Sequence, residues 1–178
     1  MVYLERTDGV SSTEIRSEQQ PITLGLVGES SILNKIERES QFVNGLETGK
    51  VYTLNDRFLT GCLKDKARHA ASYDELLASS DALYIISAPE LHYSQIKKAL
   101  ECGKHVLCES PVTLRSEEWR ELKALAAEKG VVLLDAIKTA YSMAYNRLLL
   151  LAKSGIIGDI VSVDASCTSL HEVDPEQD

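Results

Sequence analysis

Three turns of the sequence carry residue types that could do chemistry, and each follows a short apolar run. They are Gly28-Glu29-Ser30, Ser87-Ala88-Pro89 and Glu109-Ser110-Pro111. The third turn leaves the run HVLC for a carboxylate, a hydroxyl and a proline, and such groups can bind ligands or transfer protons where a buried element reaches the surface. What these turns can do depends on the elements that hold them.

The composition indicates a globular domain whose main partner is not a polyanion. The chain has 178 residues, 44% of them hydrophobic, which is enough for a core. Its 19 basic and 27 acidic residues give a net charge of −8, which argues against a nucleic acid or an anionic membrane as main partner. No C-x-x-C spacing, signal peptide or apolar run of about 20 residues is present, so we expect a cytoplasmic protein with reduced thiols and no metal site.

Strand-like and helix-like patterns alternate along the chain. Apolar runs predict strands at 22–28, 82–87, 104–108 and 131–135, and weaker patterns predict strands at 50–56 and 159–166. Segments with helical spacing separate them. This alternation predicts an α/β fold with a doubly wound, mostly parallel sheet of the Rossmann type. Ligands of such sheets gather at the carboxyl ends of the strands, where all three turns are expected.

Two stretches resemble a known family. They are DALYIISAPELHYSQIKKALECGKHVLCESPVTL at 81–114 and KSGIIGDI at 153–160. Both are similar to the Gfo/Idh/MocA oxidoreductases, and the similarity extends from about Ile22 to Ala165. The resemblance implies a Rossmann domain that binds NAD or NADP and an enzyme that oxidises or reduces a sugar or polyol, including a phosphorylated one.

The resemblance also implies catalytic positions, and one of them is changed. Family members usually have Glu-Lys-Pro where this chain has Glu109-Ser110-Pro111, and that lysine helps to move a substrate proton. A serine needs a neighbouring base for such a role. Ser110 therefore either shapes a turn or retains a substrate contact. His92 corresponds to a histidine near the nicotinamide, or else is a structural hydrogen bonder.

The cofactor positions implied by the resemblance are altered in the phosphate-binding loop. Gly28 keeps the first glycine of a G-x-G-x-x-G/A pattern, whereas Glu29 adds charge and Ser30 adds a side chain near the pyrophosphate. We therefore expect weak dinucleotide binding and no turnover by this chain. Asp56 would accept from a ribose and favour NAD over NADP, although it could equally be a solvated turn residue beside Arg57. The remaining cofactor-binding positions are Ser87, Pro89, Glu109 and Pro111.

The two ends of the chain suggest a larger protein. The segment ERTDGVSSTEIR at 5–16 resembles the R-T-x-G-I-S-T-T signature of glycerol-phosphate and choline-phosphate cytidylyltransferases, in which arginine and hydroxyl groups hold the triphosphate of CTP. The alternative is a capped helix start or an unstructured leader. We expect a leader at 1–20, a Rossmann domain at 21–158, and at 159–178 the first strand of a truncated second domain followed by an acidic tail.

Two classes of function follow. The first is an enzyme module that binds a dinucleotide and acts on a sugar or polyol phosphate, as part of a bifunctional cytidylyltransferase-oxidoreductase. The second is an inactive Rossmann module that serves as a scaffold, regulator or oligomerisation partner of a cytidylyltransferase. Intact Glu109, Pro111, His92 and Asp56 favour the first class. Ser110, Glu29-Ser30 and the expected absence of the second family domain favour the second. In either class we expect a homo-oligomer or a partner domain.

Overall fold

The computed structural model describes residues 20–166, and within them five strands form one sheet. The strands are β1 (Ile22–Gly28), β2 (Leu46–Tyr52), β3 (Ala82–Ile86), β4 (His105–Cys108) and β5 (Leu133–Asp135). The helices that follow the first four strands are α2 (Ile32–Ser40), α3 (Tyr73–Ala78), α4 (Pro89–Glu101) and α5 (Ser116–Lys129). Three 3₁₀ turns lie between β2 and α3, at Asp56–Phe58, Gly61–Lys64 and Lys66–Arg68.

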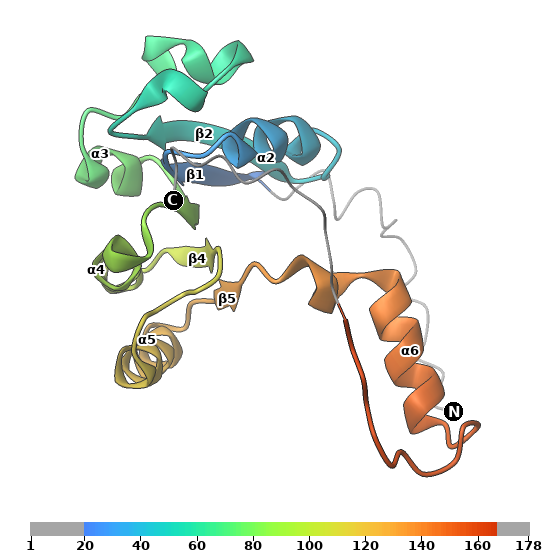
Figure 1. Cartoon of the computed structure of the whole chain (residues 1–178). Helices are drawn as coiled ribbons and strands as arrows, with labels where there is room; N and C mark the ends of the chain where they lie inside the picture. Colours follow the sequence, from blue (N-terminus) through green and yellow to red (C-terminus); the bar gives the residue numbers. More distant parts are fainter. Residues whose placement is uncertain (1–19, 167–178) are drawn as a thin grey trace, which may run out of the picture. The chain divides into compact units, whose positions relative to one another are not determined.

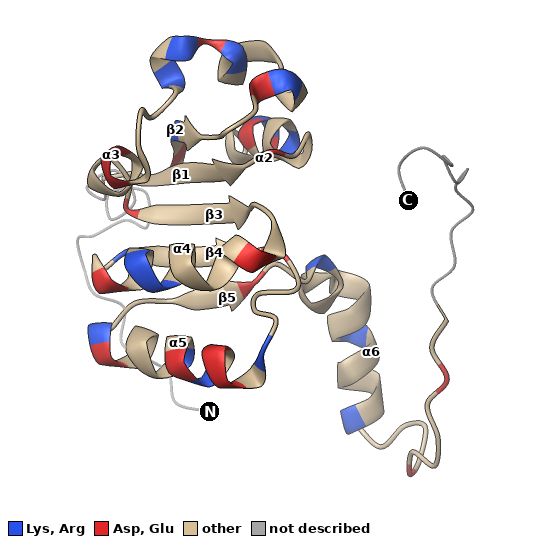
Figure 2. Cartoon of the chain, turned by 60° about the vertical axis from the view of Figure 1, so that its left-hand side comes forward, with Lys and Arg blue, Asp and Glu red and all other residues tan. Residues whose placement is uncertain are grey.

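Every strand pair of this sheet is parallel, in the order β2-β1-β3-β4-β5 (Figure 2). Tyr84 in the central strand β3 pairs with Leu26 of β1 on one side and with Leu107 of β4 on the other. The parallel pairing of the four apolar runs is confirmed. It follows from their continuous apolar character, which a strand needs when both of its faces are covered.

The two faces of the sheet pack against different helices (Figure 1). On one face Leu83 and Ile85 of β3 join a cluster with α3, α4 and α5, including Ile96 and Leu122. On the other face Tyr84 joins a cluster with β1, β2, α2 and the 3₁₀ turns, whose members include Leu26, Leu33, Val51, Leu59 and Leu63. Successive β3 residues thus point to opposite faces, which produces the two-layer covering of a doubly wound fold.

Three local expectations differ from the structure. The strand predicted at 50–56 lies at Leu46–Tyr52, because residues 46–48 and 51–52 pair with β1 on either side of a register shift and the chain then turns. Ser116 is of a type that commonly caps helices and stands before Glu117 and Glu118, which predicts an N-cap at Ser116. The structure has Arg115 at the N-cap of α5, with Ser116 as the first helical residue. Finally, 159–166 form no strand. Alternating apolar and polar residues form a strand only where a neighbouring strand can bond to their backbone groups. Residues 159–166 pair with no strand of the described chain, and Val161 and Val163 are 96% and 81% exposed.

The described residues divide into two compact units, 20–137 and 138–166. The first contains the sheet. The second contains a 3₁₀ turn (Lys138–Tyr141) and α6 (Met143–Lys153), whose N-cap Ser142 accepts a hydrogen bond from the Tyr145 amide. The cytidylyltransferase-like motif and the acidic tail lie outside the described residues.

Candidate functional site at the carboxyl edge of the sheet

The strand order reverses between β1 and β3. From β1 the chain passes through α2 to β2 on one side, and from β2 it crosses back to β3 on the other side of β1. The crevice outside the carboxyl ends of two such strands is where open α/β sheets bind ligands. The sheet topology therefore points to the ends of β1 and β3 as the candidate site.

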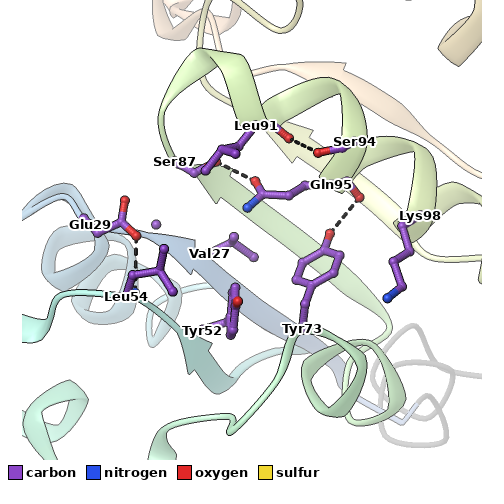
Figure 3. Close-up of a pocket in the computed structure, with 11 residues that line it drawn as sticks. Val27, Glu29, Tyr52, Leu54, Tyr73, Ser87, Leu91, Ser94, Gln95 and Lys98 are labelled. Atoms are coloured by element: carbon purple, nitrogen blue, oxygen red, sulfur yellow. Dashed lines mark hydrogen bonds between the residues drawn. The ribbon is translucent and has the colours of Figure 1, made fainter.

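A cavity of about 300 Å³ opens at this point (Figure 3). Its strand-end lining comes from Gly28, Tyr52 and Ser87, and Leu91, Gln95 and Lys98 line it from α4. The volume is at the lower end of the range for small-molecule sites. Its mixed lining of aromatic, aliphatic and amide groups suits an organic ligand that makes a few hydrogen bonds.

Gly28 ends β1 in a conformation that requires glycine. Its φ is +130°, and a Cβ atom at this position would lie 2.5 Å from the Ile86 carbonyl oxygen. The missing side chain lets β1 and β3 approach closely and turns the chain into α2. This is the role of the first glycine in a dinucleotide-binding loop.

The two residues after Gly28 use their side chains locally. Oε1 of Glu29 accepts a hydrogen bond from the Leu54 amide at 3.3 Å, which ties the loop after β1 to the segment after β2. Oγ of Ser30 accepts from the Ile32 amide at 3.2 Å. The first amides of a helix are the natural donors to a phosphate, so Ser30 already occupies one donor that a pyrophosphate would use.

The β3–α4 turn holds the far wall of the cavity. Ser87 donates to the side-chain oxygen of Gln95 at 2.5 Å, and the Tyr73 hydroxyl donates to the Gln95 carbonyl at 2.8 Å. Pro89 occupies the first turn of α4, where its fixed φ suits the helix and its lack of an amide proton costs nothing. Gln95 thus links α3 and the β3–α4 turn across the cavity wall, as Figure 3 shows.

His92 is buried in this turn, with 2% of its surface exposed. Its Nδ1 lies 2.9 Å from the Pro111 carbonyl oxygen and its Nε2 lies 2.9 Å from the Ser87 carbonyl oxygen. Both ring nitrogens therefore face backbone acceptors. The imidazole ties the turn after β3 to the turn after β4, which agrees with the structural alternative for this histidine.

Glu109 lies directly after β4 and accepts a hydrogen bond from the hydroxyl of Tyr84 at 2.5 Å. Tyr84 is 1% exposed. Burial raises the pKa of this phenol above its usual range, and the hydrogen bond to Glu109 raises the pKa further. The neutral phenol is therefore a permanent donor that fixes the Glu109 carboxylate at the edge of the sheet.

Ser110 has an acidic neighbour. Its hydroxyl donates to Oδ1 of Asp135, the last residue of β5, at 2.6 Å. Asp135 also lines a second cavity of about 260 Å³, together with Pro111, Thr113 and Trp119. The Asp135 carboxylate thus contacts Ser110 and the Glu109 carboxylate belongs to the preceding residue, at the position where the family resemblance implies a lysine.

Asp56 and Arg57 lie in the first 3₁₀ turn after β2, and neither lines the cavity. Asp56 forms an ion pair with Lys66, whose hydrogen bond and charge hold the pKa of that carboxyl below its usual value. The guanidinium of Arg57 lies 4.4 Å from the centre of the Phe58 ring. Of the predicted cofactor residues, Gly28, Glu29 and Ser87 line the cavity, and Asp56 already has a cationic partner.

Sequence reasoning missed Tyr84, Gln95 and Asp135. Asp135 ends a predicted strand next to that of Glu109, so the rule that strand ends share one edge could have identified it. Gln95 follows Leu91 by four positions and precedes Lys98 by three, a spacing that places all three on one helical face. Tyr84 gave no such signal, because an aromatic residue within an apolar run is ordinarily core.

Within residues 20–166 no group of three or more histidine, cysteine, aspartate or glutamate side chains is arranged to hold a metal ion. In the same part of the chain, none of the helices has the length and apolar character that a membrane crossing needs.

The comparisons with known proteins agree with this architecture. In curated sequences, a dTDP-3,4-didehydro-2,6-dideoxy-alpha-D-glucose 3-reductase of Streptomyces violaceoruber is 37% identical over 115 residues, covering 58% of this chain and 34% of the relative. A scyllo-inositol 2-dehydrogenase (NADP(+)) of Bacillus subtilis is 30% identical over 131 residues, covering 71% and 40%. The chain thus spans well under half the length of these relatives.

Solved structures show the same fold. The apo scyllo-inositol dehydrogenase of Lactobacillus casei superimposes with a TM-score of 0.68 at 24% identity, over 79% of this chain and 44% of that one. A UDP-N-acetylglucosamine 3-dehydrogenase of Acidithiobacillus ferrooxidans gives a TM-score of 0.64 at 25% identity, over 72% and 42%. The shared part is the Rossmann-type sheet with its covering helices.

The match to a family model extends over residues 32–136, which is more than half of the chain, and the description of that family is an oxidoreductase family with an NAD-binding Rossmann fold. It agrees with the parallel sheet, the reversed strand order and the glycine turn at the end of β1. On this evidence the chain belongs to the Gfo/Idh/MocA family of oxidoreductases.

Proposed function

We propose that this chain is the dinucleotide-binding part of an oxidoreductase that acts on a sugar or polyol, including a phosphorylated one. The observation that carries the proposal is the cavity where the strand order reverses. The Gly28 turn lines this cavity, and the chain belongs to an NAD-binding family. NAD is favoured over NADP. A bound nicotinamide would supply hydride transfer, and the residues of this chain would hold it and orient it.

The residues at the edge of the sheet fit such a cofactor in part. The Gly28 turn and the first amides of α2 suit a pyrophosphate, and Ser87 and Gln95 offer polar groups across the cavity. The Ser30 hydroxyl opposes pyrophosphate binding because it engages a helix amide, and the Glu29 carboxylate adds a negative charge that disfavours phosphate groups but not ribose hydroxyls. We therefore expect dissociation constants in the range from about ten micromolar to a millimolar, well above those of a tight nanomolar site.

The substrate class is inferred from the relatives and from the acidic groups beside Ser110. The names of both curated relatives describe carbohydrate or cyclitol chemistry. Polyol hydroxyls are good donors to carboxylates such as Glu109 and Asp135. Because Ser110 cannot act as an ammonium, we propose that the isolated chain binds the dinucleotide without turning over a polyol.

Calorimetry with NAD and NADP, followed by nicotinamide absorbance assays with sugar and polyol phosphates, tests this proposal. Leu91 lines the cavity and Leu114 is an exposed leucine that does not. Leu91→Trp should abolish dinucleotide binding, and Leu114→Trp should not. Equal binding by both variants would place the ligand elsewhere, and absence of binding by the unaltered chain would refute the proposal.

A second candidate is the scaffold of a cytidylyltransferase, and residues 5–16 favour it. We propose that, if dinucleotides do not bind, the segment marks a bifunctional protein in which this Rossmann module serves the neighbouring transferase. Its test is the native full-length protein, assayed for CTP-dependent transfer before and after deletion of 21–158. Transfer that depends on the module without NAD binding supports the scaffold, whereas unchanged transfer refutes it.

A further inference from the structure

Dinucleotide-binding sheets use a carboxylate near the end of the second strand to accept from the adenosine ribose, and this carboxylate also disfavours the 2′-phosphate of NADP. In this sequence Asp56 occupies that place by its order in the chain. In the structure its carboxylate is paired with Lys66, and Asp56 does not line the cavity.

Another carboxylate, that of Glu29, reaches the end of β2 from the end of the neighbouring strand β1. Glu29 follows Gly28 directly, lines the cavity, and accepts at 3.3 Å from the amide of Leu54, two residues beyond the end of β2. Figure 3 shows this contact among the residues that line the cavity. The side chain thus brings its charge to the gap between the ends of β1 and β2.

We propose that Glu29, rather than Asp56, is the carboxylate that accepts the ribose hydroxyls of the cofactor and selects NAD over NADP. The inference rests on the proposed function and adds to it the residue that sets cofactor choice. One oxygen of Glu29 holds the Leu54 amide, and a carboxylate has acceptor sites to spare for two vicinal hydroxyls.

The charges nearby support the choice of NAD. A 2′-phosphate at this place would bring its negative charge beside the Glu29 carboxylate, and like charges at short range repel strongly in a partly enclosed site. The nearby cations already have partners: Lys66 pairs with Asp56, Lys98 of the cavity lining pairs with Asp74, and Arg57 lies against Phe58. Ribose hydroxyls, by contrast, are neutral donors.

The test compares isosteric charge removals at three acidic positions. The variants are Glu29→Gln, Asp56→Asn and Glu39→Gln, the last on the exposed side of α2, and each is titrated with NAD and NADP by calorimetry. We expect the unaltered chain to bind NAD at least tenfold more tightly than NADP. Glu29→Gln should reduce that ratio at least fivefold, chiefly through tighter NADP binding, while Asp56→Asn and Glu39→Gln keep it within twofold.

The outcomes separate this inference from the proposed function. If the unaltered chain binds NAD but Glu29→Gln keeps the ratio, or Asp56→Asn lowers it equally, the assignment to Glu29 is overturned and dinucleotide binding stands. If the unaltered, folded chain binds neither cofactor, both fall together. Glu29→Ala serves as a second variant, and circular dichroism verifies that each protein is folded.

Discussion

The hydroxyl of Ser110 donates a hydrogen bond to Oδ1 of Asp135 at 2.6 Å, and this contact joins the turn after β4 to the end of β5. A lysine at position 110 would face the same carboxylate as an ion pair. The exchange of lysine for serine therefore preserves a polar link at this edge of the sheet while removing the positive charge.

The strength of this link can be measured with a double-mutant cycle of Ser110→Ala, Asp135→Asn and the double variant. A hydrogen bond to a carboxylate is worth about 1.5–3 kcal/mol when shielded, but Ser110 is exposed, so we expect a coupling energy of about 1 kcal/mol. Urea denaturation gives the free energies of unfolding. Additive effects would show that the contact contributes nothing to stability.

Much of the fold was predictable because the apolar runs are short and continuous. Such runs imply strands covered on both faces, and Gly28, Gly103 and Gly130 each end an element where a positive φ is required. The alternating run at 159–166 predicted a strand that the structure does not have, because periodicity cannot show whether a partner strand is available.

The candidate site was only partly predictable. The positions of Gly28, Glu29 and Ser87 followed from strand ends, since the carboxyl ends of parallel strands share one edge. The pairing of Asp56 with Lys66, however, depends on how the 3₁₀ turns fold back, and sequence spacing does not encode that path. The link between Tyr84 and Glu109 likewise required the register of β3 and β4.

Gly28 should tolerate alanine less well than another glycine of positive φ. In Gly28→Ala the new methyl group meets the Ile86 backbone at 2.5–2.6 Å, whereas Gly130, at φ +67°, has nothing within 4 Å of its missing Cβ. We expect Gly130→Ala to cost about 1 kcal/mol and Gly28→Ala to cost about 3 kcal/mol or more. Thermal and urea unfolding measure both, and equal costs would contradict the close approach of β1 and β3.

Replacing Ser30 with glycine should strengthen dinucleotide binding. The variant releases the Ile32 amide from the Ser30 hydroxyl and removes a side chain from the phosphate side of the loop. One recovered hydrogen bond of about 0.5–1.5 kcal/mol corresponds to an affinity gain of roughly two- to twelvefold. Calorimetry with NAD measures it.

The matched control for that experiment is Ser31→Gly, because Ser31 makes no side-chain capping bond at the start of α2. Its affinity for NAD should stay within about twofold of the unaltered chain, which is less than 0.5 kcal/mol. Equal gains in both variants would mean that loop flexibility, and not the freed amide, is responsible.

The stability of the sheet should decline in alkali, and the buried thiol of Cys108 should begin the decline. Burial raises the pKa of Cys108 from 9.0 to about 12, with smaller contributions from Asp135 and Glu109. Below about pH 9 the thiol is protonated in both folded and unfolded chains, so its contribution to stability is fully present. Above it the unfolded chain loses the proton that the folded chain keeps, and the free energy of unfolding falls by at most about 1.4 kcal/mol per pH unit for this group.

Urea midpoints measured at intervals from about pH 8 to about pH 11 test this expectation, since burial of Tyr73 and Tyr84 also raises their pKa values and adds to the decline from about pH 10. Cys108→Ala lowers stability at every pH because it leaves a cavity, but it should flatten the curve between about pH 9 and pH 10. Cys102 is exposed, so Cys102→Ala is the matched control and should retain the slope. A slope unchanged in Cys108→Ala would show that the thiol loses its proton at the same pH in the folded and unfolded chains. Its burial at the end of β4 would then have no influence on alkaline unfolding.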